Sequence, residues 1–110
     1  MRRDEQRLSD ILEALDWITK AIVGRTEEDF VADETLCFAV AQRLTMIGEA
    51  VARLSPELKA RYGSVPWQDI IGLRNILVHE YFGIHWPLVW QTAADHVPVL
   101  RDQIVAIAKE

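Results

Sequence analysis

The sequence has little cysteine, proline or glycine, and it has no excess of positive charge. A single cysteine, Cys37, cannot form a disulfide within the chain, so a reducing, cytoplasmic setting is expected. No apolar signal-peptide core follows the opening MRRDEQRLSD, and no apolar run approaches the roughly 20 residues of a membrane span. The net charge of -5 argues against a broad electrostatic grip on nucleic acid. We therefore expect a soluble, intracellular protein with no membrane partner.

What the sequence does have is helical periodicity, in an amount that fits one domain over residues 1–110. Thr26 and Asp29 offer the start of a short turn, and Asp33 can cap the long helix that follows. Before them, near Gly24, a first amphipathic helix stops. Its apolar residues recur at steps of three and four: Leu8, Ile11, Leu12, Leu15, Ile18 and Ile22. The long helix repeats the pattern with Leu36, Val40, Leu44, Ile47, Val51 and Leu54.

The second half of the chain also reads as helix. Ser55 and Pro56 open a short helix that ends near Gly63, and SVPW opens the next. The last helical segment begins around GIHWP and runs to Lys109, with Pro98 marking a kink or a break. We find no strand pattern and no repeat. The prediction is an all-α up-and-down bundle of four or five helices.

One stretch, LRNILVHEYFGI, places polar residues in an otherwise apolar helix. At about 100° per residue, a stripe of four residues falls within about 60° of arc at steps of four, three and four. This stripe consists of Gln68, Gly72, Asn75 and His79. The rest of the circumference is apolar: Ile70, Leu73 and Leu77 on the far side, and Ile71, Ile76 and Val78 at the flanks. The stripe is therefore a narrow polar gap.

Several features make this stripe a candidate site. A glycine in mid-helix costs about 1 kcal/mol relative to alanine, so Gly72 predicts a docking face where a backbone or ligand comes close. Asn75 and His79, four residues apart, can form a hydrogen bond that orients the imidazole. Arg74 can swing its long side chain toward the same spot, and Tyr81 shares the azimuth of Arg74.

Such a set of residues suits phosphodiester chemistry. Histidine, which titrates near about pH 6.5, can take a proton from a ribose 2′-hydroxyl or give one to a leaving oxygen. A guanidinium can bind the phosphate oxygens. One histidine cannot easily do both proton transfers in one step, so a second copy across a two-fold axis is expected. No metal-ligand spacing accompanies the set, which predicts a metal-free site. By spacing alone, a salt-bridged surface or a packed core histidine is the commoner outcome.

The motif resembles a known family. Arg74, Asn75, His79, Glu80 and Tyr81 match the R-x4-H-x-Y signature of the HepT-like toxins, a branch of the HEPN superfamily. The resemblance continues through IGEAVARLS, RYGSVPWQDIIGLRN and YFGIHWPLVWQTAADHVPVLRDQI, and so covers most of the chain.

The resemblance implies a HEPN bundle that forms a homodimer with its two motifs facing each other. Together they would make a metal-independent ribonuclease site for RNA (tRNA or mRNA), with no cofactor. Arg74 and His79 would be the catalytic pair, and Asn75 the polar residue that supports them. The implied partner is an MntA-like minimal nucleotidyltransferase antitoxin, which neutralises the toxin by moving AMP from ATP to the motif tyrosine, here Tyr81.

Two further residues are weighed beside the motif. Glu49, inside a helix, is expected to form a buried ion pair with an arginine and could hold Arg74 in place, in a supporting role. His85 stands where many relatives have an acidic residue, so it either weakens the start of the last helix or joins the active face, and the structural interpretation is preferred. The acidic run from Glu27 to Glu34 is expected to be a solvated face, and docking of a basic patch of the antitoxin is the alternative ranked second.

The motif is also compatible with a second class of function. In it the chain is a non-catalytic regulatory or nucleotide-binding partner of the nucleotidyltransferase, and Tyr81 serves only as the AMP acceptor. Cys37 is expected to be a small buried residue. The tryptophans, Trp17, Trp67, Trp86 and Trp90, are expected to fill core and interface rather than to stack on bases.

Overall fold

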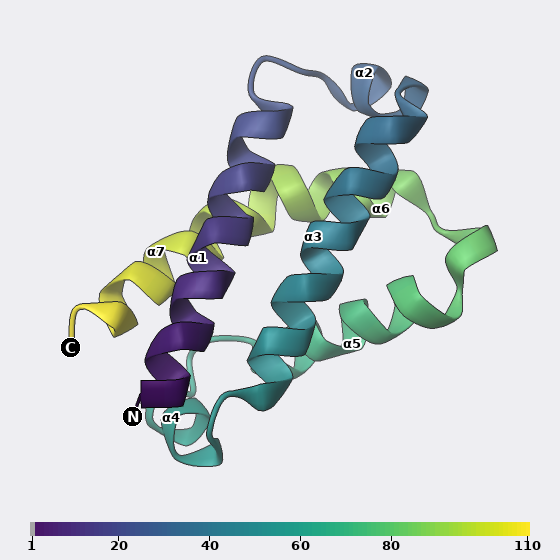
Figure 1. Cartoon of the computed structure of the whole chain (residues 1–110). Coiled ribbons are helices and arrows are strands. Elements are labelled where there is room, and N and C mark those ends of the chain that lie inside the picture. The colour runs from purple at the N-terminus through teal and green to yellow at the C-terminus, as the bar shows by residue number, and fades with distance from the viewer. Residues whose placement is uncertain (1) are drawn as a thin grey trace.

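A computed structural model describes residues 2–110, with the side chain of Arg2 left aside, and it consists of helices joined by short turns (Figure 1). Within this range there is no strand, which confirms the predicted all-α bundle. The longer helices are α1 (Arg2–Ile22), α3 (Glu34–Arg53), α5 (Trp67–His79) and α7 (Val97–Ala108). The shorter elements are α2 (Glu27–Ala32), α4 (Pro56–Arg61), the 3-10 turn η1 (Tyr81–Gly83), α6 (Trp86–Gln91) and the π turn η2 (Thr92–His96).

Helix α3 is the centre of the bundle. It packs against α1 on one side and α5 on the other, while α7 packs against α1 (Figure 1). All six apolar residues predicted for its inner face are buried, and on α1 Leu8, Ile11, Leu15 and Ile18 are buried as well. Burial of a Leu or Ile side chain contributes about 1.5–3 kcal/mol to stability. Burial of these two apolar faces is therefore the main interaction that stabilises the packing of α1 against α3.

Helix α3 also has a property that the sequence reading missed. Its 20 residues contain a window of mean hydropathy 1.2, so by length and composition alone α3 could cross a membrane. The expectation that no apolar run approaches a membrane span is wrong on that measure. In the structure 44% of this window is buried, and the helix lies between α1 and α5. This is the position of a core helix in a globular bundle.

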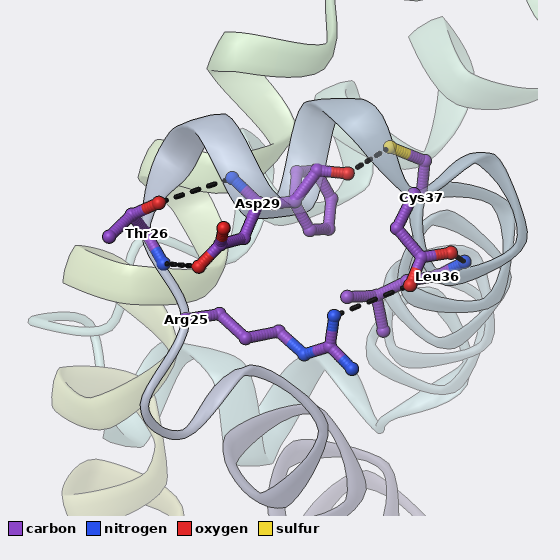
Figure 2. Close-up of polar contacts among 7 residues, drawn as sticks. Arg25, Thr26, Asp29, Leu36 and Cys37 are labelled. Atoms are coloured by element: carbon purple, nitrogen blue, oxygen red, sulfur yellow. Dashed lines mark hydrogen bonds and ion pairs between the residues drawn. The ribbon is translucent and has the colours of Figure 1, made fainter.

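The turn between α1 and α3 is fixed by caps that the sequence predicts. Gly24 takes a positive φ of 75°, which lets the chain leave α1. Thr26 and Asp29 then form a capping box, in which each side chain accepts a hydrogen bond from the backbone N–H of the other (Figure 2). Asp33 caps α3 by accepting the backbone N–H of Leu36 at 3.1 Å.

Cys37 lies beneath this turn. Its thiol donates a hydrogen bond to the carbonyl oxygen of Phe30 at 3.1 Å (Figure 2), and the side chain is almost fully buried. Burial raises the pKa of the Cys37 thiol, and the nearby carboxylates of Asp33 and Glu34 raise it further. The thiol therefore stays protonated, as expected of a small buried residue.

A buried carboxylate joins the start of α1 to the start of α4. Asp4, only 4% exposed, accepts the backbone N–H of Ser55 at 2.9 Å and its hydroxyl at 2.7 Å. Burial raises the pKa of Asp4, but the two hydrogen bonds from Ser55 outweigh it and leave that pKa below its usual value. Ser55 in turn caps α4 through the N–H of Leu58 at 3.2 Å, as predicted.

We expect Asp4→Asn to lower the free energy of unfolding by about 2 kcal/mol at pH 7, because it removes the charge from two hydrogen bonds. A lowered pKa in the folded state means that this contribution is present above the unfolded pKa of about 3.9 and is lost as the pH falls through the folded value. The difference in free energy of unfolding between wild type and variant should thus shrink below about pH 4. Urea unfolding at several pH values measures it, with the exposed neighbour variant Glu5→Gln as control. A gap independent of pH would contradict this account.

The last helical segment is interrupted close to Pro98. Residues Thr92–His96 form a π turn between α6 and α7, in which Val97 donates its N–H to the carbonyl oxygen of Thr92. Pro98 has no N–H and its ring crowds the preceding turn, so the regular α-helical pattern cannot continue through this point. The predicted kink or break is therefore seen as a π turn just before the proline.

Candidate active site

The polar stripe of α5 faces away from the bundle. Leu77 is buried against the core, while Asn75 and His79 are exposed and Arg74 is half-buried. Helical spacing predicts this division, and the structure shows it. His79 is therefore accessible to solvent and is not a packed core histidine.

Arg74 is held by two oxygen atoms. One guanidinium nitrogen donates to Oδ1 of Asn75 at 2.9 Å, and the other donates to Oε1 of Glu49 on α3 at 3.3 Å. The predicted ion pair is present, but it is not buried: the side chains of Arg74 and Glu49 are 29% and 44% exposed, so the pair contributes at most about 1 kcal/mol to stability. Its main effect is orientation, because it fixes where the guanidinium lies at the surface of α5.

The predicted hydrogen bond between Asn75 and His79 is wrong. Oδ1 of Asn75 accepts from Arg74 instead, since the adjacent long side chain reaches it directly. Within residues 2–110 the imidazole of His79 makes no hydrogen bond. Asn75 therefore positions the arginine and does not set the orientation of the histidine.

Gly48 is a site residue that the sequence reading overlooked. A Cβ at this position would lie 2.3 Å from Cβ and 2.9 Å from Cγ of Arg74, distances that side-chain carbons do not reach. Only glycine lets α5 cross α3 this closely at the point where Arg74 leaves its helix. The signal was present, because Gly48 interrupts the apolar face of α3 just before Glu49. By contrast, nothing lies within 4 Å of a Cβ placed at Gly72.

Tyr81 belongs to an aromatic cluster and not to the helix. Helix α5 ends at His79, so the predicted shared azimuth with Arg74 does not apply; Tyr81 lies in η1. Its ring centroid is 5.5 Å from that of Phe38 on α3 and 5.3 Å from that of Phe82. The Tyr81 side chain is still 55% exposed, so its hydroxyl can be reached from solvent. Phe38 supports Tyr81, and no local sequence pattern marks it for this role.

Apolar side chains surround the exposed polar residues. We call the set Ile76, Val78, Tyr81 and Phe82 the motif patch, and its members are 42% to 100% exposed, with Phe82 at the upper end. Ile76 and Val78 lie on the two sides of the stripe that carries Asn75 and His79. An apolar rim around polar groups is typical of a surface that binds another molecule.

The remaining histidines and tryptophans have structural positions. His85 precedes α6 without forming a side-chain cap, in line with a weakened helix start, and His96 is exposed on η2. Trp67 is buried, and its indole N–H donates to the carbonyl oxygens of Lys59 and Tyr62. The other three tryptophans are half-buried. In the part of the chain that the structure describes, no three His, Cys, Asp or Glu residues gather as metal ligands would.

The arrangement can therefore perform two chemical tasks at one surface. An oriented guanidinium can bind phosphate oxygens, and a solvent-accessible imidazole can accept or donate a proton. Both come from the last two turns of α5.

Comparison with known proteins agrees with this picture. Residues 11–107 match the family model described as "Ribonuclease HepT-like". Over the whole chain and 98% of the relative, the sequence is 34% identical to "Putative RNase TTE0752" of Caldanaerobacter subterraneus subsp. tengcongensis. It is 31% identical, over 98% of each chain, to "Probable ribonuclease HepT" of Thermococcus cleftensis. No solved structure matches the chain.

Proposed function

The chain belongs to the HepT-like ribonuclease family, and on that premise we propose that it is a toxin of a toxin–antitoxin pair that cleaves RNA in the cytoplasm without a metal ion. The observation that carries the proposal is the exposed motif at the end of α5. There Glu49 and Asn75 hold Arg74, and His79 is exposed five residues further along the same helix.

The chemistry follows from RNA itself. His79 removes the proton from a ribose 2′-hydroxyl, and the 2′-oxygen attacks the adjacent phosphorus. The bond from phosphorus to the 5′-oxygen of the next nucleotide breaks, and that oxygen leaves after it gains a proton. Arg74 binds the phosphate oxygens as negative charge builds on them. The products are a 2′,3′-cyclic phosphate and a free 5′-hydroxyl, so no water and no metal enters this step.

A homodimer would supply the second proton transfer. The motif patch around His79 is apolar and exposed, and the open space at Gly72 leaves room for close backbone approach. If these faces met across a two-fold axis, the imidazole of one copy would act as base and that of the other as acid. The apolar rim would be buried in the same contact, which supports association.

The proposal predicts cleavage in the presence of EDTA. Purified wild-type chain, incubated with tRNA and with mRNA, should yield fragments that end in 2′,3′-cyclic phosphate and begin with 5′-hydroxyl. Mass spectrometry of the fragments identifies these ends. Intact RNA after prolonged incubation, or activity that returns only when a divalent ion is added, would contradict the proposal.

Control by a nucleotidyltransferase antitoxin would act on Tyr81. The phenol oxygen attacks the α-phosphorus of ATP, pyrophosphate leaves, and the phenol proton passes to solvent or to a base of the antitoxin. The 55% exposure of Tyr81 makes the oxygen reachable. The transferred AMP adds a bulky anion on the motif surface, where it would compete with substrate phosphate for Arg74.

The chain offers a matched test of this modification, because it has two tyrosines. After co-expression with a minimal nucleotidyltransferase, the intact mass should rise by that of one adenylyl group (AMP less one water) in wild type and in Tyr62→Phe, and should not rise in Tyr81→Phe. Tyr62 is the control because its hydroxyl donates to Glu110 at 2.7 Å, an interaction that raises its pKa and disfavours the phenolate.

Two results would change the assignment. AMP on Tyr62, or on neither tyrosine, would remove Tyr81 from its proposed role without affecting the nuclease proposal. AMP on Tyr81 in a chain that cleaves no RNA would favour the alternative, a non-catalytic partner of the nucleotidyltransferase.

A further inference from the structure

A groove of about 390 Å³ runs between α1 and α3 and reaches the residue that holds Arg74. Glu49 lines this groove and also forms the ion pair with Arg74 across to α5. The groove and the candidate active site therefore share Glu49.

Three arginines line the groove: Arg7, Arg43 and Arg53. Within residues 2–110 none of them forms an ion pair, although carboxylates lie in the same groove. Arg7 donates instead to the carbonyl oxygen of Arg53 at the end of α3, at 3.0 Å. Elsewhere in the bundle, arginines do bind carboxylates: Arg25, Arg61, Arg74 and Arg101.

Three acidic residues, Asp10, Glu13 and Glu49, line the same groove. Glu49 is paired with Arg74, and Asp10 accepts a hydrogen bond from the neutral side chain of Gln6 at 3.0 Å. With Arg74 counted beside Glu49, the groove carries one net positive charge in a chain of net charge -5. Among residues 2–110 its three guanidinium groups have no carboxylate partner, so they are available to a ligand.

Arg43 has an additional feature that suits a nucleic acid. Its guanidinium carbon lies 4.5 Å from the ring centroid of Trp17, a cation–π stack between α3 and α1. Both side chains are only half-buried. The indole ring covers one face of the planar guanidinium and orients it. An unpaired base can stack on the opposite face of such a plane.

The spacing along α3 matches an extended ligand. Arg43 and Arg53 lie on either side of Glu49, and at 1.5 Å per residue they are roughly 15 Å apart along the helix axis. A single strand with one phosphate at Arg74 could therefore continue in both directions along the arginines.

We propose that this groove binds the single-stranded RNA that flanks the cleaved phosphate, with Arg43 on Trp17 as a base-stacking platform and Arg53 as a phosphate contact. The inference rests on the proposed ribonuclease function, since it names the path of that substrate. The arginines act in binding and positioning and take no part in bond breaking.

Binding of a labelled, unstructured RNA 12-mer to a His79→Ala background tests the groove without cleavage. In that background, Arg43→Gln/Arg53→Gln should weaken binding at least tenfold at about 0.1 M salt. The slope of log affinity against log salt should become shallower by about 0.7, because one phosphate contact, that of Arg53, is lost. Arg25→Gln/Arg61→Gln is the matched control, with the same charge change at distant ion pairs, and should bind as the background does.

A second variant separates stacking from charge. Arg43→Lys keeps the charge but loses the planar group, so it should leave the salt slope unchanged and weaken binding about threefold or more. Unchanged affinity in Arg43→Lys would show that stacking is not part of recognition. Equal loss in the Arg25/Arg61 control, or binding of a poly-glutamate peptide as tight as that of RNA, would overturn the assignment to RNA.

Failure of this inference can be told apart from failure of the ribonuclease proposal. If wild type cleaves RNA and Arg43→Gln/Arg53→Gln binds and cleaves equally well, the groove assignment is wrong and the nuclease stands. If wild type cleaves nothing but the double variant loses affinity and salt slope, the groove still binds RNA and the nuclease proposal falls.

Discussion

Replacing His79 with alanine is expected to reduce the rate of RNA cleavage by at least about 100-fold. General acid–base catalysis by a positioned side chain contributes about 10²–10⁴ in rate, and His79 is the histidine exposed on the same stripe as Asn75. The fold should be unaffected, because the imidazole makes no hydrogen bond within residues 2–110. Single-turnover cleavage of a labelled RNA measures the rate, and thermal unfolding verifies the fold.

His96→Ala provides the matched control for this prediction. His96 is also exposed, but it lies on η2, away from the motif patch. Its variant should cleave at the wild-type rate. A His79→Ala protein that folds normally and cleaves within a few-fold of wild type would exclude the imidazole as the proton carrier.

The second large effect is expected from the smallest substitution. Gly48→Ala would place a methyl group 2.3 Å from Cβ of Arg74 and 3.3 Å from the carbonyl oxygen of Ile70, so α3 and α5 must separate. Overpacking of this kind costs about 1–3 kcal/mol. Separation also lengthens the contact between Glu49 and Arg74, now 3.3 Å, and so misplaces the guanidinium. We expect cleavage to fall by at least tenfold, beyond what the lost stability explains.

Gly72→Ala is the control for the stability of Gly48→Ala and not for its activity, because it makes the same change on α5 but lies on the proposed dimer face. Nothing lies within 4 Å of the added methyl group, so the single chain should be stabilised by about 1 kcal/mol through helix propensity. Urea unfolding measures the stability of both variants. The cleavage rate divided by the folded fraction gives the activity per folded molecule. Full activity per folded molecule in Gly48→Ala would show that the close crossing of α3 and α5 does not position Arg74.

Local signals in the sequence predicted much of the fold. The inner face of α3, the cap at Asp33 and the cap at Ser55 each depend on residues a few positions apart, so period and cap chemistry suffice to place them. The exposure of Asn75 and His79 followed from the same reasoning, because the opposite side of α5 is apolar.

The sequence could not show how the helices meet. The contact of Gly48 with Arg74 and the packing of Phe38 against Tyr81 join α3 to later elements, and helical spacing carries no information on such pairs. The expected bond between Asn75 and His79 failed for a related reason. The imidazole of His79 and the guanidinium of Arg74 could both donate to Oδ1 of Asn75, and in the structure Arg74 does so.

The fully exposed ring of Phe82 bears on how the dose of this protein would matter to a cell. If the chain forms the proposed homodimer, burial of this ring in the contact stabilises the dimer, and the dimer fraction rises with protein concentration. Pair formation follows the square of abundance, and when association is weak a halved supply leaves about one quarter of the pairs. An active site shared between two copies would therefore show little activity at low protein concentration, and its activity would rise steeply as the concentration increases.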